Sequence, residues 1–147
     1  MNDIELSYLA GLFDGEGSAG VYIINRKGTK WHPRTYRTAY PVVQLRMTDA
    51  EPVRAFHKAF GGWFGMSKPK DKKQNGDAKK LVYEWRISHR PALAVARALV
   101  VWCRNPSKVV QFQKIIDHYA QWVRPIKGQI RYPVNANVEH DPKPKEL

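Results

Sequence analysis

The spacing of apolar and polar residues predicts eight elements of secondary structure in the order α-β-β-α-β-β-α-α. Apolar residues at helical spacing predict helices over residues 3–14, 50–60, 91–103 and 107–123. Runs rich in β-branched and aromatic residues predict strands over residues 18–26, 36–47, 63–68 and 81–88. The remaining residues, 124–147, are rich in proline and predict an extended C-terminal extension of weak order.

Residues that cap or interrupt these elements refine their limits. Gly15 and Gly17 are expected to end the first helix, and Asp49 is expected to cap the second. Pro41 lies inside the second strand and lacks a backbone N–H, which predicts an edge position or a bulge there.

Composition narrows the class of protein. The 147 residues include 25 Lys and Arg against 13 Asp and Glu, so the formal net charge is +12. Such a charge attracts polyanions, with nucleic acid the first candidate partner and an anionic membrane surface the second. No apolar run is long enough for a transmembrane helix, and the acidic N-terminus has no signal-peptide pattern, so an intracellular protein is expected.

The cysteine and tryptophan content indicates core positions and excludes two kinds of site. The single cysteine, Cys103, excludes a disulfide framework and a zinc cluster built on cysteines, and it is expected to be a buried thiol. The tryptophans at 63, 85, 102 and 122 are predicted to be core residues.

Residues 9–17, LAGLFDGEG, are an unusual end for a helix. Gly11 and Gly15 each cost about 1 kcal/mol relative to alanine inside a helix. Asp14 and Glu16 place negative charge at the helix C-terminus, which the helix dipole disfavours. Small residues four apart would let two helices approach closely, and paired acids beside carbonyl oxygens would suit a divalent cation. The alternative is a glycine-rich helix end with solvated acids.

The motif resembles the LAGLIDADG motif of homing endonucleases, from which it differs at Phe13, Gly15 and Glu16. The resemblance spans about residues 4–123 and implies an α+β fold, in which a four-stranded antiparallel sheet forms a DNA-binding saddle. Residues 1–123 would be the endonuclease domain. One motif in the chain implies a homodimer on double-stranded DNA, with no role for a membrane. The implied dimer interface comprises Leu9, Ala10, Gly11, Asp14 and Gly15.

The resemblance also implies site-specific cleavage of both DNA strands at a long, roughly palindromic site. Glu16 would be a catalytic metal ligand and the Gly15 carbonyl a further ligand, while Asp14 would have a structural role at the helix end. Mg²⁺ would be the cofactor, Mn²⁺ a substitute, and Ca²⁺ would support binding only. Because metals held between two subunits need an acid from each, the active site would belong to the dimer.

Two supporting positions are less certain from the sequence. The family's lysine at the start of the last long helix corresponds to Lys108, with Arg104 second, although Lys108 is equally well read as a solvated lysine. The family's polar residue near the end of the second strand corresponds to Met47, which cannot position water. Arg46, Gln44 or Thr48 could take that role.

Alternate residues of the predicted strands are expected to read DNA bases, since arginine and glutamine match guanine and adenine edges. These residues are Tyr22, Ile24, Arg26, Thr38, Tyr40, Gln44, Arg46, Glu84 and Arg86. A basic, turn-rich loop is predicted over residues 69–80. Lysines in it and at its start are expected to contact phosphates or, in part, solvent only: Lys68, Lys70, Lys72, Lys73, Lys79 and Lys80. Two rival functions are an RNA maturase or non-cleaving binding protein of the same fold, and a basic ribosomal-type protein without metal or dimer.

Overall fold

The computed structural model describes residues 1–31, 33–67 and 81–121. Its elements confirm the predicted order, and the predicted loop 69–80 and the extension 124–147 lie outside the described residues. The elements are α1 (Asp3–Glu16), β1 (Gly17–Arg26), β2 (Tyr36–Met47), α2 (Ala50–Phe60), β3 (Trp63–Ser67), β4 (Val82–Ser88), α3 (Arg90–Leu99) and α4 (Pro106–Ala120).

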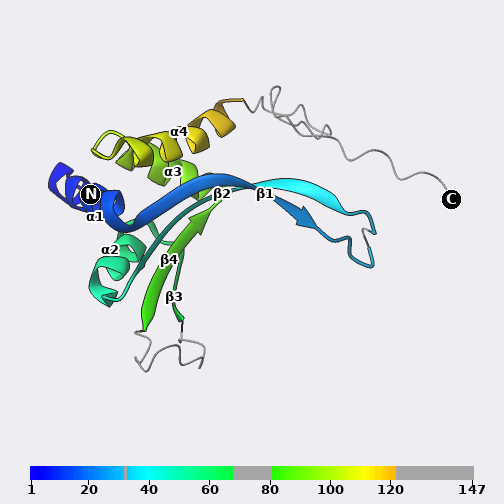
Figure 1. Cartoon of the computed structure of the whole chain (residues 1–147), viewed down its shortest axis with the longest axis horizontal. Helices are drawn as coiled ribbons and strands as arrows, with labels where there is room; N and C mark the ends of the chain where they lie inside the picture. Colours follow the sequence, from blue (N-terminus) through cyan, green and yellow to red (C-terminus); the bar gives the residue numbers. More distant parts are fainter. Residues whose placement is uncertain (32, 68–80, 122–147) are drawn as a thin grey trace, which may run out of the picture.

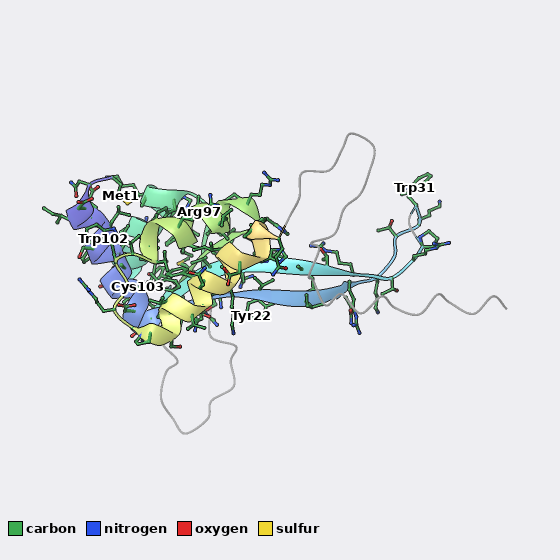
Figure 2. All side chains as sticks on the ribbon, turned by 90° about the horizontal axis from the view of Figure 1, so that it is seen from above. Met1, Tyr22, Trp31, Arg97, Trp102 and Cys103 are labelled. Carbon is green, nitrogen blue, oxygen red and sulfur yellow. The ribbon has the colours of Figure 1, made fainter. Side chains whose placement is uncertain are left out.

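The four strands form one antiparallel sheet in the order β1-β2-β4-β3, so the fold is α+β as expected. The helices lie on one face of this sheet and leave the other face uncovered (Figure 1). The β1–β2 hairpin is longer than β3 and β4, and it extends well beyond the helices (Figures 1 and 2). No helix in the described part of the chain is long and apolar enough to cross a membrane.

Two helix ends differ from the sequence prediction. α1 continues through Gly15 to Glu16, and since Gly15 faces open space, its missing side chain costs only helix propensity. The helix ends at Gly17, where an added Cβ would lie 2.1 Å from the Phe13 ring. α3 ends at Leu99 rather than at residue 103, and a turn follows.

Pro41 lies in β2 just beyond the end of the pairing with β4, so its missing N–H leaves no gap in that ladder. β2 pairs with β4 only from Val42 onward, and beyond that point the Pro41 carbonyl accepts a hydrogen bond from the His89 N–H at 2.8 Å. Because the N–H and C=O groups of a residue in an antiparallel strand face the same neighbour, the proline nitrogen lies where the β4 ladder has ended. Asp49 caps α2 as predicted, with its carboxylate accepting from the Glu51 N–H.

The core lies between the helices and the sheet and is centred on aromatic rings. Phe13 of α1 stacks on Phe112 of α4 with ring centroids 4.5 Å apart, and Phe56 of α2 packs against Trp85 of β4 at 5.0 Å. All four rings are fully buried. Their contacts fix the ends of α1 and α4 relative to the sheet, and this positions the residues described next.

Candidate functional site

The two acids of the motif have different surroundings at the junction of α1 and β1. The Asp14 carboxylate accepts a hydrogen bond from the Arg104 N–H at 2.6 Å, and its backbone carbonyl accepts from the Asn105 side chain at 3.2 Å. Asp14 therefore joins the end of α1 to the start of α4, and its second carboxylate oxygen is buried without a hydrogen-bond partner. Glu16 is exposed, and within the described residues its carboxylate makes no hydrogen bond or ion pair.

Two side chains of α4 hold the start of β1. Lys108 donates from Nζ to the Gly17 carbonyl at 2.5 Å, and Gln111 accepts from the Ala19 N–H at 2.9 Å. In a continuing helix that N–H would bond the Gly15 carbonyl, so Gln111 helps to end the helix beside Glu16. The lysine is partly buried against the junction, which argues against the reading of Lys108 as a fully solvated side chain. Gln111 was not among the predicted site residues.

Cys103 lies behind this junction and is a buried thiol, as predicted. Burial first, and then the neighbouring Asp14 carboxylate, raise the pKa of the Cys103 thiol to about 12, although the positive charge of Lys108 acts in the opposite direction. The thiol is therefore neutral at physiological pH and is neither a nucleophile nor a metal ligand in this state.

The face of α1 turned away from the core carries apolar and small residues. Ile4 and Tyr8 are exposed, and a Cβ added at Gly11 or Gly15 would meet no atom within 4 Å. The interface predicted from the motif needs a correction. Leu9 and Ala10 are buried in the core of their own chain and cannot contribute side chains to a partner.

The described part of one chain does not contain a ready-made metal site. It has no group of three or more His, Cys, Asp or Glu side chains placed to hold an ion. Hard cations such as Mg²⁺ and Ca²⁺ take six or more oxygen ligands. The Glu16 carboxylate and nearby carbonyl oxygens fit such a cation in kind but fall short in number, so further oxygens from a second chain or from a phosphate are needed.

The sheet face opposite the helices, which we call the saddle face, holds the strand residues predicted to read bases. The strand registers pair Tyr22 with Tyr40, Ile24 with Thr38, Gln44 with Arg86, and Arg46 with Glu84, and Arg26 has the same orientation as Tyr22. The structure thus brings these nine residues to one surface. Their contacts with bases remain a prediction.

Met47 has the opposite orientation to Arg46 and packs against the core. The polar candidates for positioning water that lie on the saddle face of β2 are Gln44 and Arg46, and Thr48 follows the strand end. The lysines predicted to contact phosphates, Lys68, Lys70, Lys72, Lys73, Lys79 and Lys80, lie outside the described residues.

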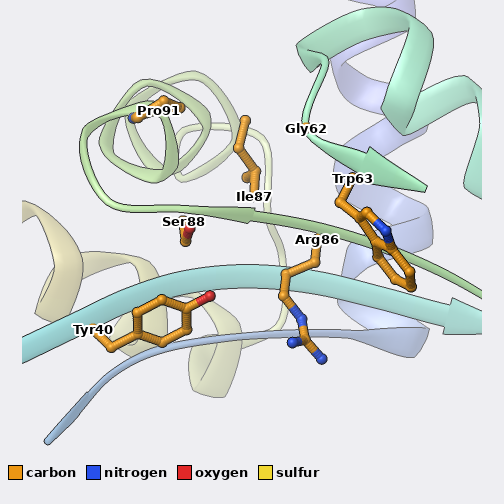
Figure 3. Close-up of a pocket in the computed structure, with 7 residues that line it drawn as sticks. All are labelled: Tyr40, Gly62, Trp63, Arg86, Ile87, Ser88 and Pro91. Atoms are coloured by element: carbon orange, nitrogen blue, oxygen red, sulfur yellow. The ribbon is translucent and has the colours of Figure 1, made fainter. Parts of the chain in front are cut away.

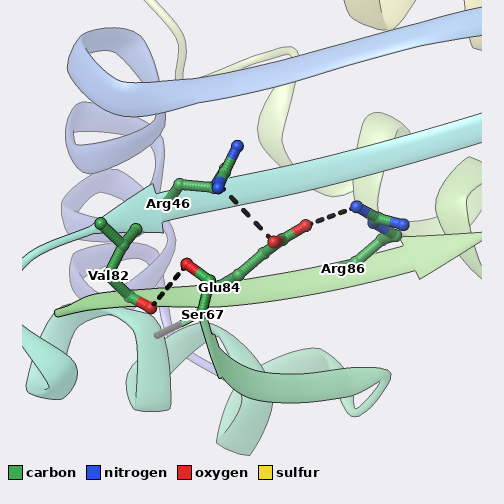
Figure 4. Close-up of polar contacts among 5 residues, drawn as sticks. All are labelled: Arg46, Ser67, Val82, Glu84 and Arg86. Atoms are coloured by element: carbon green, nitrogen blue, oxygen red, sulfur yellow. Dashed lines mark hydrogen bonds and ion pairs between the residues drawn. The ribbon is translucent and has the colours of Figure 1, made fainter. Parts of the chain in front are cut away.

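Glu84 differs from the other saddle-face residues because it is only 8% exposed. One carboxylate oxygen lies 3.6 Å from Nε of Arg46, and the other lies 2.5 Å from Nη2 of Arg86 (Figure 4). This burial does not fit the prediction that Glu84 contacts bases directly, since most of its surface is already covered by the protein.

A pocket of about 560 Å³ lies beside Arg86. It is lined by side chains from β2, β3, β4 and the start of α3 (Figure 3). The lining residues include Tyr40, Trp63, Arg86 and Ser88. Trp63 was predicted to be a core residue, but it is 54% exposed, and its ring lies over Gly65 so closely that a Cβ there would be 2.3 Å away. Sequence reasoning missed this exposure because β3 is an edge strand with one uncovered face.

The long β1–β2 hairpin carries a concentration of positive charge. Residues 17–48 contain no acid and six basic residues: Arg26, Lys27, Lys30, Arg34, Arg37 and Arg46. At its tip Trp31 is exposed, and Nζ of Lys30 lies 5.8 Å from the ring centroid (Figure 2). This hairpin is suited to a polyanionic partner.

Comparison with solved structures shows a known fold, whereas neither family models nor curated protein sequences match the chain. The homing endonuclease I-CvuI in complex with the I-CreI target has a TM-score of 0.57 at 14% identity, covering 80% of this chain and 67% of that one. I-CeuI complexed with DNA has a TM-score of 0.55 at 14% identity, covering 81% and 56%. The LAGLIDADG homing endonuclease I-LtrWI bound to target DNA has a TM-score of 0.53 at 16% identity, covering 81% and 39%.

The chain thus spans two thirds of the first of these proteins and less of the other two. At such low identity the likeness concerns the fold, which is the α+β LAGLIDADG homing-endonuclease fold.

Proposed function

We propose that the protein is a site-specific endonuclease that hydrolyses both strands of DNA, using divalent metal held between two copies of the chain. The observation that carries this proposal is the position of Glu16. It is an exposed carboxylate with no hydrogen-bond or ion-pair partner among the residues that the structure describes, and it lies where the glycine-bearing face of α1 meets the start of the basic β1–β2 hairpin. An acid at such a surface would repel DNA unless a cation offset its charge.

The exposed face of α1 supports the dimer. Gly11 and Gly15 lie four residues apart and have open space above them, so a second α1 can approach to backbone distance there. Ile4 and Tyr8 continue this face toward the N-terminus and would bury apolar surface in the contact. Two copies joined along α1 would bring two Glu16 carboxylates together at one end of the interface.

The junction residues have complementary roles in this proposal. Glu16 and the Gly15 carbonyl would hold the cation, while Asp14 keeps the helix end against α4 through the Arg104 and Asn105 contacts. A bound Mg²⁺ ion would supply an activated water and stabilise the charge that develops on the phosphate. Lys108 lies beside the same junction, and its ammonium group would favour the anionic phosphate there.

The saddle face supplies DNA binding in this proposal. The acid-free β1–β2 hairpin neutralises phosphates, and the side chains of Gln44, Arg46 and Arg86 read base edges in the major groove. The solved structures with this fold that are named above are complexes with DNA, which supports the same class of ligand.

The test is incubation of the purified protein with genomic DNA of its host in Mg²⁺, followed by sequencing of the new DNA ends. We expect double-strand breaks at one or a few long sites that recur between replicates. A parallel gel-shift assay separates the rival functions. Tight binding without recurrent breaks would indicate a non-cleaving binding protein, and selective binding of RNA over DNA would indicate a maturase. Either result would overturn the proposal.

A further inference from the structure

Glu84 is an unexpected residue for a surface that binds polyanions. Among the residues that the structure describes, Glu84 is the one charged residue that is buried. It lies on the saddle face between two arginines. A carboxylate here weakens the attraction of the face for DNA, and burial of a charge is costly unless the charge is paired. Both facts call for a specific role.

The geometry pairs each carboxylate oxygen with a different arginine. Arg46 is the cross-strand partner of Glu84 on β2, and Arg86 lies two residues further along β4 on the same face. The distances are 3.6 Å from Oε2 to Nε of Arg46 and 2.5 Å from Oε1 to Nη2 of Arg86 (Figure 4).

Burial is distributed unevenly across this cluster. The side chain of Glu84 is 11% exposed, whereas those of Arg46 and Arg86 are 56% and 44% exposed. The carboxylate is thus covered, and the guanidinium groups are open to a ligand. Nε of Arg46 lies 3.6 Å from the carboxylate, which is an ion-pair distance and longer than a hydrogen bond. Within the described residues its terminal nitrogens are therefore open to the bidentate geometry that matches guanine O6 and N7.

Fixing these arginines matters because a free arginine loses much rotamer freedom when it binds. Two guanidinium groups on adjacent strands also repel each other, and a shared carboxylate between them removes that repulsion. Arg86 lines the pocket together with Tyr40 and Trp63, so its guanidinium group faces open space that a ligand could enter (Figure 3). One buried carboxylate therefore restrains both guanidinium groups.

We propose that Glu84 is a positioning residue, which fixes Arg46 and Arg86 so that they read guanines in the DNA target without contacting a base itself. This inference rests on the proposed DNA-binding function. Loss of the Glu84 charge then lowers selectivity at the positions read by the two arginines, while general attraction to DNA stays the same or increases.

The experiment compares Glu84→Gln with Glu51→Gln in selection of bound DNA from a randomised library, without any need for cleavage. Glu51 is a matched control because it is also paired with an arginine, Arg54, at 3.6 Å, but lies exposed on α2. We expect Glu84→Gln to reduce the preference for guanine at the affected positions by about 5- to 150-fold, the discrimination that a bidentate contact provides. Glu51→Gln should keep the original preference.

Four further outcomes decide between the alternatives. A Glu84→Gln variant that selects the same site as strongly as Glu51→Gln would overturn the inference, as would a change confined to one cytosine position, which indicates direct base reading by Glu84. If Glu84→Gln fails to fold, Glu84→Asp is tested instead, and it should retain part of the guanine preference because it keeps the charge. If the unmutated protein selects no sequence at all, the proposed function itself fails.

Discussion

The β1–β2 hairpin should account for much of the salt dependence of DNA binding. Arg26, Lys27 and Arg34 are exposed cations in a segment without acids, and Lys30 is left unchanged because it lies over the Trp31 ring. Each phosphate that a protein neutralises contributes about 0.9 to the slope of log affinity against log salt. Replacing all three by glutamine should lower the slope by up to about 2.7 per chain. Between 50 and 200 mM salt, this is a difference of up to about 40-fold in affinity per chain.

The assay is a titration of fluorescent duplex DNA by anisotropy at several salt concentrations. The control variant replaces Lys58, Arg97 and Lys114, which are exposed on α2, α3 and α4 and lie away from the saddle face. It removes the same net charge but should leave the slope nearly unchanged. Equal slopes for the two triple variants would contradict a special role for the hairpin, because binding would then follow net charge rather than the position of the charges.

Three other predictions concern the interface, a tight turn and the buried thiol. Gly11→Leu should fold, with about 1 kcal/mol of gained helix propensity, because a Cβ at this position meets no atom of its own chain within 4 Å. It should be monomeric by light scattering, because the added side chain would block the close approach of a second α1. A dimeric variant would exclude this interface. Gly62→Ala should lower the melting temperature more than Gly61→Ala, since both have positive φ but only at Gly62 would a Cβ lie 2.7 Å from a carbonyl oxygen. The free energy of unfolding should fall as pH rises from 9.0 toward about 12, because in this range the Cys103 thiol ionises in the unfolded chain but stays neutral in the folded one. Cys103→Ala should reduce this decline, as measured by denaturant titrations at several pH values.

Much of the fold could be predicted from the sequence, because local signals and tertiary packing agree. The alternation in β4 places Trp85 and Ile87 in the core, and Asp49 caps α2 as its position indicates. Helix ends were less predictable. α1 continues through Gly15 because the helix end depends on Gln111 and Lys108 of α4, which are distant in the sequence.

The candidate site was only partly predictable for the same reason. The motif identifies Asp14 and Glu16, but their different surroundings depend on Arg104 and Asn105 at the start of α4. The burial of Glu84 depends on strand register, which no local pattern reveals. The exposure of Trp63 follows from the edge position of β3, which is a property of the sheet order.

The most direct test of the account is cleavage of a plasmid carrying the mapped target site by the Glu16→Gln variant in Mg²⁺. The substitution preserves size and one carbonyl oxygen but removes the charge proposed to hold the cation. We expect that cleavage is abolished and that gel-shift binding to the same site is retained or tightened. The control variant Glu51→Gln, which replaces an exposed acid on α2, should cleave normally. Near-normal cleavage by Glu16→Gln would contradict its role as metal ligand and the mechanism that depends on it.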